Sequence, residues 1–404
     1  MEPKAAFVKL RQEMAIELER ILEFWGRSAV DKTNGGFVGQ ITHSGLVDAS
    51  ANKGGILNAR ILWTFSAAYR FNRSERAEKL AERAFQYLKN HFWDKENGGL
   101  FWELDCFGKP VNKRKQAYAL GFGIYAFSEY FRATECKESL QLAINLYDIL
   151  EQHFFDEEFG GYIEALDESW NLLYDMRLSE KDENFPKSMN THLHILEPYT
   201  NLYRVWPNQK LKKRITHLIE VFQDHIIDKQ SGHFNLFFEM DWTNRSTIVS
   251  YGHDIEGAWL LNEAALVVEE KELIRKVQKD ALRLVDITLN EGTDLDGSIF
   301  YERNGEHLDS DKHWWPQAEA LVGLMDAWEL TNNHKYLEEL LRVWNFVKAN
   351  IIDIENGEWY GRVDKSGKAI ATEDKAGFWK CPYHNSRALI EIINRIDRSK
   401  ILQQ

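Results

Sequence analysis

Three histidines in this chain stand at the beginning of segments with helical periodicity, and together they could carry out proton transfer. They are His194, His253 and His384. An unperturbed imidazole titrates near pH ~6.5, and an aromatic, desolvated site keeps it neutral and able to act as a base. A single histidine at a helix start is more often a cap or a satisfied core residue. Three of them at equivalent places in three helices favour a catalytic pocket.

The same helix starts carry other polar and aromatic residues that a buried helix does not need. Asn190, His194 and Glu197 are spaced i, i+4 and i+7, which places them on one face of a helix. Glu256 follows His253 by three residues, so its carboxylate is expected to orient that imidazole. The candidate substrate-binding residues are Arg60, Tyr118, Asn190, Glu256, Trp314, Trp315, Glu319 and Trp379.

Other chemistries fit these residues less well. Glycoside hydrolysis needs two carboxylates that flank the scissile bond; the helix starts hold few carboxylates, and Glu256, Glu319 and Asp254 form no evident pair. On a helix, the side chains of His192 and His194 diverge by about 200° and cannot share one ion. No glycine-rich phosphate loop follows a strand. We therefore expect no metal and no cofactor, and keep a hydrolase and a non-catalytic sugar-binding barrel as alternatives.

A repeated pattern shows which elements must position these residues. An Asp-x-x-x-Gly turn, or a close variant, recurs six times, 60 to 72 residues apart. Its glycines are Gly35, Gly98, Gly160, Gly232, Gly297 and Gly357. Such a repeat means that one supersecondary unit is stacked on its neighbours. Each glycine is expected to adopt a positive φ and to be followed by a short β-hairpin.

Each repeat lies between two helical patterns, and the second helix of each pair is the more apolar. Six outer–inner pairs predict an all-α (α/α)6 barrel with short β-hairpins in the loops, formed by one domain over residues 1–404. A linear solenoid is the structural alternative, but the first helix (5–25) and last helix (385–396) do not resemble polar caps. In such a ring all six inner helices start at the same end, so their first turns should line one pocket.

The composition of the chain indicates which binding partners and which cellular compartment to expect. The net charge of −13 disfavours nucleic-acid binding, and no apolar run is long enough to span a membrane. The N-terminus does not resemble a signal peptide, and the three cysteines cannot all pair. We expect a cytoplasmic protein, and the pattern leaves open whether it is a monomer or a homodimer.

Four segments resemble a known family. They are NTHLHILEPYTNLYRVWPN (190–208), YGHDIEGAWLL (251–261), KHWWPQAEAL (312–321) and WKCPYHNSRAL (379–389). They are similar to the cellobiose 2-epimerases, a branch of the N-acylglucosamine 2-epimerase superfamily, whose fold is the (α/α)6 barrel. The resemblance covers nearly the whole chain. The Trp314-Trp315 pair and the WKCPYH run favour this branch over the acylglucosamine epimerases and the mannose isomerases.

The resemblance implies a reaction and roles for the residues. The enzyme would epimerise C2 of the reducing-end glucose of β-1,4-linked disaccharides such as cellobiose, lactose or mannobiose, through ring opening and a cis-enediolate. His253 and His384 match the acid/base pair, and His194 matches a third histidine that helps ring opening or holds O1. Arg60, Tyr118, Asn190 and Glu256 match the polar shell, while Trp379 and one or both of Trp314 and Trp315 match the walls of the sugar site. The alternative within the superfamily is an aldose–ketose isomerase of free mannose or glucose.

Overall fold

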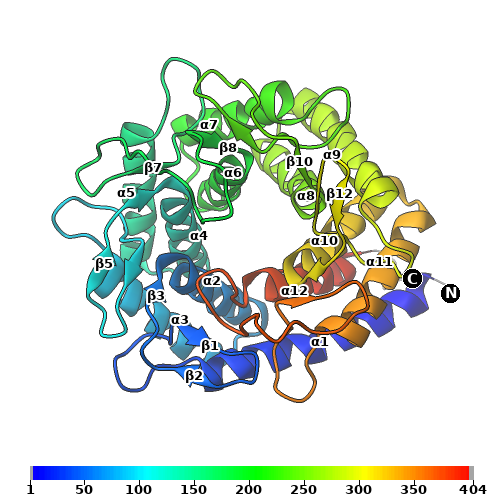
Figure 1. Cartoon of the computed structure of the whole chain (residues 1–404), viewed down its shortest axis with the longest axis horizontal. Coiled ribbons are helices and arrows are strands. Elements are labelled where there is room, and N and C mark those ends of the chain that lie inside the picture. Colours follow the sequence, from blue (N-terminus) through cyan, green and yellow to red (C-terminus); the bar gives the residue numbers. More distant parts are fainter. Residues whose placement is uncertain (1–2, 400–404) are drawn as a thin grey trace.

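The computed structural model describes residues 3–399, and within them twelve α-helices form two concentric rings (Figure 1). The outer helices are α1 (Pro3–Ser28), α3 (Glu75–Tyr87), α5 (Lys137–His153), α7 (Gln209–Val221), α9 (Lys271–Glu291) and α11 (His334–Phe346). The inner helices are α2 (Gly55–Asn72), α4 (Ala117–Thr134), α6 (Met189–Tyr203), α8 (Tyr251–Val268), α10 (Trp314–Thr331) and α12 (Tyr383–Arg398). The predicted (α/α)6 barrel is confirmed. Three outer helices, α3, α7 and α11, end in a π-helical turn (Leu88–Phe92, Phe222–Ile226 and Val347–Ile351).

The ring is closed by contacts between its first and last repeats, which excludes the solenoid. Helix α12 packs against both α1 and α2 (Figure 1). Arg11 of α1 donates two hydrogen bonds to the carboxylate of Asp397 in α12, at 2.5 and 2.9 Å. A β-bridge joins Ile41 to Ala376. Closure buries the apolar faces that a solenoid would leave exposed at its two ends.

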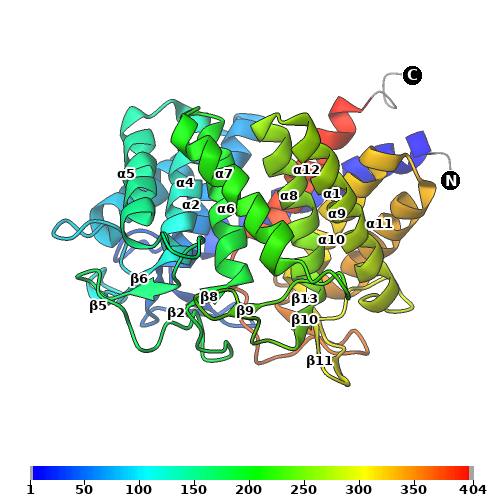
Figure 2. The same cartoon turned by 90° about the horizontal axis from the view of Figure 1, so that it is seen from above.

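Short antiparallel strands gather at one end of the barrel, below the helices in Figure 2. They are β1 (Gln40–Ile41), β2 (Val47–Asp48), β3 (Lys53–Gly54), β4 (Glu103–Leu104), β5 (Pro110–Asn112), β6 (Lys115–Gln116), β7 (Ala165–Leu166), β8 (Lys187–Ser188), β9 (Phe237–Phe238), β10 (Ile248–Ser250), β11 (Glu302–Asn304), β12 (His307–Asp309), β13 (Lys312–His313) and β14 (Arg362–Val363). Most of the pairs link the strand before an inner helix to the hairpin of the next repeat, as β3 pairs with β4. The hairpins therefore tie neighbouring repeats together at the end where the inner helices begin.

The repeated glycines have the predicted backbone conformation. Gly35, Gly98, Gly160, Gly232, Gly297 and Gly357 all have φ between 74° and 93°. A side chain is strained in this left-handed region, so glycine is the residue that makes the turn without cost.

Buried lysines stabilise five of the six loops. The repeat pattern did not predict them. In each, a lysine pairs with the aspartate that opens the loop, at 2.6 to 2.8 Å. In four of them the lysine lies two residues before the inner helix, and in the last repeat Lys375 lies further ahead of α12. The pairs are Lys53–Asp31, Lys115–Asp94, Lys187–Asp156, Lys312–Asp294 and Lys375–Asp353. The fourth repeat has Val249 at this position. There His233 Nδ1 pairs instead with Asp254, at 2.7 Å. The recurring lysine was visible in the sequence as one more member of the repeat.

Replacing Lys115 by Met is expected to destabilise the barrel by about 1–3 kcal/mol, because it leaves a buried carboxylate without its cation. Burial alone would raise the pKa of Asp94, but Lys115 and the backbone N–H groups of Asn97 and Glu96 lower it. Those two N–H groups remain in the variant and limit the loss. Urea unfolding measures the change. The exposed Lys79, paired with Glu75, is the matched control, and Lys79→Met should alter stability by less than about 0.5 kcal/mol. An equal loss in both variants would contradict the role of the buried pair.

Within residues 3–399 no helix has both the length and the apolar character to cross a membrane. Cys106, Cys136 and Cys381 are all free thiols.

Candidate active site

A cavity of about 620 Å³ lies at the hairpin end of the barrel, where the inner helices begin. Ten of the eleven predicted site residues line it: Arg60, Tyr118, Asn190, His194, His253, Glu256, Trp314, Trp315, Trp379 and His384. They come from α2, α4, α6, α8, α10, α12 and the segment before α12. Glu319 is fully buried and does not line the cavity, but it lies beside two lining residues, Glu256 and His384. The rule that inner helices share one starting end therefore brings together residues that are far apart in the sequence.

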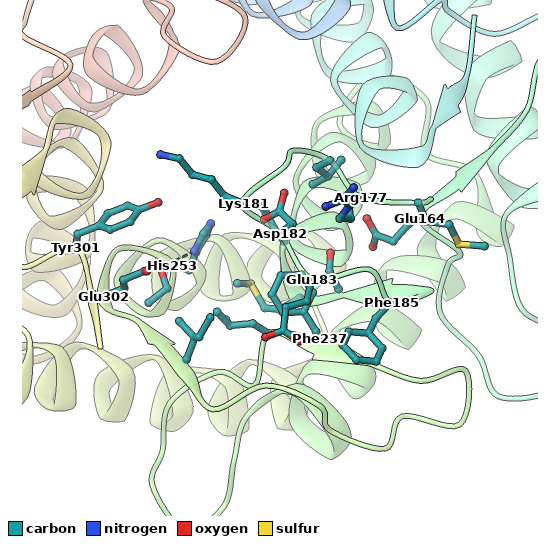
Figure 3. A pocket seen from close by; sticks show the side chains of 18 residues that line it. Glu164, Arg177, Lys181, Asp182, Glu183, Phe185, Phe237, His253, Tyr301 and Glu302 are labelled. Atoms are coloured by element: carbon teal, nitrogen blue, oxygen red, sulfur yellow. Dashed lines mark hydrogen bonds between the residues drawn. The ribbon is translucent and has the colours of Figure 1, made fainter. Parts of the chain in front are cut away.

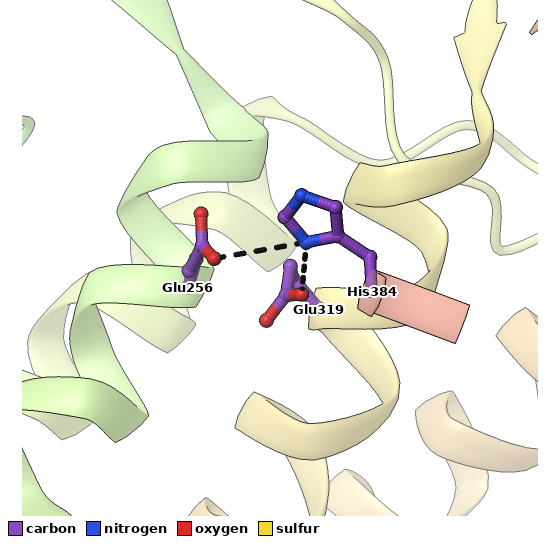
Figure 4. Close-up of side chains that lie close together, drawn as sticks. All are labelled: Glu256, Glu319 and His384. Carbon is purple, nitrogen blue, oxygen red and sulfur yellow. Dashed lines mark hydrogen bonds and ion pairs between the residues drawn. The ribbon is translucent and has the colours of Figure 1, made fainter. Parts of the chain in front are cut away.

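The imidazole of His384 is held in place by a carboxylate that is hydrogen-bonded to its Nδ1. Its Nδ1 lies 2.6 Å from Oε1 of Glu319 and 3.8 Å from Oε1 of Glu256 (Figure 4). A carboxylate only accepts, so Nδ1 carries the proton and Nε2 keeps its lone pair for the cavity. Burial, with the nearby charge of Arg60, lowers the pKa of His384 well below its usual range. His384 is therefore a neutral imidazole with a fixed tautomer, ready to accept a proton at Nε2.

His253 has a different partner from the one predicted. Its Nδ1 lies 2.7 Å from Oγ of Ser250, the residue three positions before it, whereas Glu256 faces Arg387. The expectation that Glu256 orients His253 was wrong, because Arg387 of α12 engages the carboxyl group of Glu256 instead. Burial lowers the pKa of His253 to about 4. Its ring packs against Trp315, with the ring centroids 4.6 Å apart, and the ring of His384 lies 5.8 Å from the same indole.

Three buried glutamates surround one arginine at the floor of the cavity, so the expectation of few carboxylates was also wrong. Nη2 of Arg387 donates to Glu256 at 2.9 Å and to Glu319 at 2.7 Å, and Nη1 donates to Glu197. Burial raises the pKa of Glu256 to about 8. Burial and the neighbouring Glu256 also raise the pKa of Glu319, but its three donors, Arg387, the indole of Trp259 and Nδ1 of His384, favour its ionised form. Glu256 accepts fewer hydrogen bonds than Glu319, so of these two carboxyl groups it is the one that more readily holds a proton.

Glu256, Glu319 and His384 are also close enough to ligate one metal ion. The guanidinium of Arg387 already bonds both carboxylates and so supplies the positive charge at this place. These residues form an ion-pair network that holds His384 in place. The expectation that the site binds no metal stays a prediction.

His194 is held by its own helix and by a close neighbour. Its Nδ1 lies 3.0 Å from Oε2 of Glu197, as expected for residues on one helix face. Pro198 lies within α6, which continues through it, and has no N–H for the carbonyl of His194. A Cβ on Gly121 would lie 2.4 Å from that carbonyl oxygen, so only glycine allows α4 to approach here. Burial, reinforced by Arg60, lowers the pKa of His194 well below its usual range.

Arg60 brings a permanent positive charge to the cavity wall. Its Nη2 donates to Oη of Tyr118 at 2.8 Å, and its guanidinium lies 4.3 Å from the ring centroid of Phe122. Although burial opposes the charge, the surrounding groups raise the pKa of Arg60, so it stays cationic. Its Nε has no partner among the described residues. A guanidinium in this place can stabilise an oxyanion.

The walls of the cavity are aromatic. Trp315 and Trp379 are half-buried, and Trp314 is 9% exposed with Nζ of Lys380 above its ring, at 5.1 Å. The ring of Trp379 lies 5.8 Å from that of Tyr118. Flat apolar faces beside polar groups suit the packing of sugar rings.

Several polar residues at the helix starts do structural work instead. His192 accepts from the backbone N–H of Tyr162 at 2.8 Å and contacts the carbonyl of Ser188. Its ring thus points away from that of His194, as the helix geometry predicted. Asp254 pairs with His233, and Gln317 bonds both backbone groups of Ile299. All three attach an inner helix to its loop.

Sequence reasoning missed further residues that line the cavity. Those in loops are Leu178, Ser179, Glu180, Lys181, Asp182, Tyr301, Gly361, Thr372, Glu373, Asp374, Gly377 and Lys380, and His313 of strand β13 also lines the cavity. Ser250, Glu197 and Arg387 were also left out of the predicted site. Loop residues have no helical period that could place them, but Arg387 stands three residues after His384 and could have been inferred from that spacing.

Neutral histidines, a guanidinium and tryptophans at the mouth of a barrel of helix pairs suit proton transfer on a sugar, which is the chemistry of the carbohydrate isomerases and epimerases. A model of the family described as N-acylglucosamine 2-epimerase (GlcNAc 2-epimerase) matches residues 35–388. The chain belongs to this family, and within it to the cellobiose 2-epimerase branch.

Individual relatives agree with this placement. The chain is 46% identical to the cellobiose 2-epimerase of Bacteroides fragilis, over 95% of this chain and 98% of that protein. It is 40% identical to the solved cellobiose 2-epimerase of Bacillus thermoamylovorans B4167, with a TM-score of 0.93 over 96% of this chain and 99% of that one. Identity to the D-mannose isomerase of Marinomonas mediterranea is 22%, over 94% of this chain and 96% of that protein. The similarity is thus much greater to the disaccharide enzymes than to the isomerase.

Proposed function

We propose that this enzyme is a cellobiose 2-epimerase that interconverts glucose and mannose at the reducing end of β-1,4-linked disaccharides. The observation that carries the proposal is the pair His253 and His384. The two rings approach one cavity from α8 and α12, each has Nδ1 engaged by another group, and each has Nε2 left for a ligand. Two such groups are what inversion of a C–H bond requires, since one removes the proton and the other delivers a proton to the opposite face.

The reaction follows from these positions. After the sugar ring opens, one histidine accepts the C2 proton at Nε2, and the electron pair of the C–H bond moves into a cis-enediolate. Rotation about the C2–C3 bond presents the other face of C2 to the second histidine, which donates its Nε2 proton. Each acid or base contributes on the order of 10²–10⁴ in rate.

The remaining residues support the charge that develops on the substrate. The Arg60 guanidinium and the phenol of Tyr118, 2.8 Å apart, can donate to O1 and O2 of the enediolate. His194 and Asn190 lie on the same wall and serve ring opening. The tryptophans hold the two sugar rings of a disaccharide. No step requires a metal ion or an organic cofactor.

The test is proton NMR of the purified enzyme with cellobiose in D2O, with EDTA present. We expect 4-O-β-glucosylmannose with deuterium at C2, and no free glucose. Full activity in EDTA is expected because the guanidinium of Arg387 already pairs with Glu256 and Glu319.

Other outcomes would overturn the proposal in defined ways. Free glucose would indicate hydrolysis, and loss of activity in EDTA would indicate a metal site. Formation of fructose from mannose, with no reaction of cellobiose, would indicate an aldose–ketose isomerase.

A further inference from the structure

The hydroxyl of Ser250 stands at the start of α8 but does not cap the helix. Serine is a preferred N-cap residue because its Oγ accepts a backbone N–H of the first turn, which stabilises by about 1 kcal/mol. Ser188 does so at the start of α6, where it accepts from Thr191 at 3.1 Å. Ser250 makes no cap bond, and its Oγ instead contacts Nδ1 of His253 at 2.7 Å. The hydroxyl thus serves the histidine and not the helix.

Ser250 and His253 both line a side pocket of about 140 Å³. Figure 3 shows His253 among the side chains around this pocket. The pocket extends to Lys181 and Glu183, which are exposed to solvent. Its wall includes Glu164, a carboxyl group that is 3% exposed and accepts from Thr191 at 2.7 Å through one oxygen. The other oxygen, Oε1, has no hydrogen-bond partner among the described residues. Apolar side chains such as Leu236 and Phe237 form much of its wall, but Ser250, His253 and Glu164 supply polar partners for water, and a pocket of this size has room for several water molecules. Water held by these groups would connect the Ser250 hydroxyl, which is bonded to Nδ1 of His253, with the surface.

Epimerisation creates a need for such a link. When His384 takes a proton from C2 and His253 delivers one, the two histidines end with their protonation at Nε2 reversed. Another turnover in the same direction requires both to be restored. Nδ1 of His384 faces the acceptor oxygen of Glu319, so its tautomer is fixed. A hydroxyl both donates and accepts, so Ser250 allows Nδ1 of His253 to gain or lose a proton.

Resting on the proposed epimerase function, we propose that Ser250 and the side pocket form a proton relay to Nδ1 of His253. As the Nε2–H bond of His253 breaks and the C2–H bond forms, the O–H bond of Ser250 breaks and an Nδ1–H bond forms. Oγ then regains a proton from water in the side pocket. After the product leaves, His384 returns the proton that it took from C2 to water in the main cavity, and Nε2 of His253 takes up a proton there. Nδ1 of His253 gives its proton back through Oγ of Ser250 to water in the side pocket, so the starting tautomer is restored and protons balance. In the reverse direction each transfer is reversed.

The low basicity of His253 supports this relay. Burial lowers its pKa to about 4, so very little imidazolium is present at neutral pH. A neutral imidazole is a useful acid at Nε2 only if its other nitrogen gains a proton in the same step. Ser250 is the one side chain among the described residues that is hydrogen-bonded to that nitrogen.

The experiment compares Ser250→Ala with Ser250→Thr. For cellobiose we expect Ser250→Ala to lower kcat by about 10-fold or more with KM unchanged, and Ser250→Thr to restore most of the loss by retaining a hydroxyl. Thermal stability should not fall in Ser250→Ala, because no cap is lost. Ser74→Ala is the matched control: Ser74 caps α3 through Ala77, so this variant should lose stability and keep kcat.

A proton inventory separates a relay from a role in positioning His253. The plot of kcat against the D2O fraction should be curved in the wild type, since two protons move in one step, and linear in Ser250→Ala. Added imidazole should partly restore that variant. The relay is refuted if kcat of Ser250→Ala stays within about twofold of wild type, or if it falls while the plot stays curved and imidazole has no effect. Failure of the wild type to epimerise cellobiose at all would refute the proposed function instead.

Discussion

Replacing His384 or His253 by Asn is expected to lower kcat for epimerisation by about 10²–10⁴. Each variant should still exchange the C2 proton with solvent, but only when one of the two epimers is the substrate. A single remaining histidine can remove a proton from its own face and return deuterium to it, but it cannot reach the opposite face. His384→Asn should therefore exchange the C2 proton of one disaccharide, and His253→Asn that of the other. Proton NMR in D2O, with cellobiose and with 4-O-β-glucosylmannose as separate substrates, measures both effects.

The result also assigns each histidine to a face of C2. The control is His307→Asn, which changes an exposed histidine in strand β12 and should behave as wild type. If either variant epimerised at the wild-type rate, or if both exchanged both epimers, the two-histidine mechanism would be wrong.

Replacing Arg387 by Met is expected to destabilise the folded protein by about 3–5 kcal/mol, the range seen when one partner of a buried ion pair is removed. Arg387 is 1% exposed and bonds Glu197, Glu256 and Glu319, none of which reaches solvent freely. Without the guanidinium these carboxyl groups must stay buried without a counter-ion or take up protons. Urea unfolding measures the change in free energy.

Two further variants test the cause of that loss. Adding Glu256→Gln to Arg387→Met removes one uncompensated acid and should recover part of the stability. Arg275→Met breaks an ion pair with Glu272 in which both side chains are 77% exposed, and should change stability by less than about 0.5 kcal/mol. Comparable losses in Arg275→Met and Arg387→Met would show that burial of the network is not what matters.

The architecture and the place of the site follow from local patterns in the sequence. Helical periodicity and the Asp-x-x-x-Gly turn act over a few residues, so six copies predict six helix pairs. In a ring of such pairs every inner helix starts at the same end, and this rule placed His194, His253 and His384 around one cavity. Each lysine–aspartate pair also lies within one repeat, so the recurring lysine could have predicted these pairs.

The hydrogen-bond partner of each polar side chain in the site depends on tertiary contacts. His384 bonds Glu319, 65 residues away, and Arg387 reaches Glu256 and Glu197 on two other helices. His253 bonds Ser250 and not Glu256, although both stand three residues from it. Spacing along a helix fixes which residues share a face, but contact between faces depends on how each helix is rotated and tilted against its neighbours. That arrangement results from the packing of all twelve helices in the described chain, and no local pattern contains it.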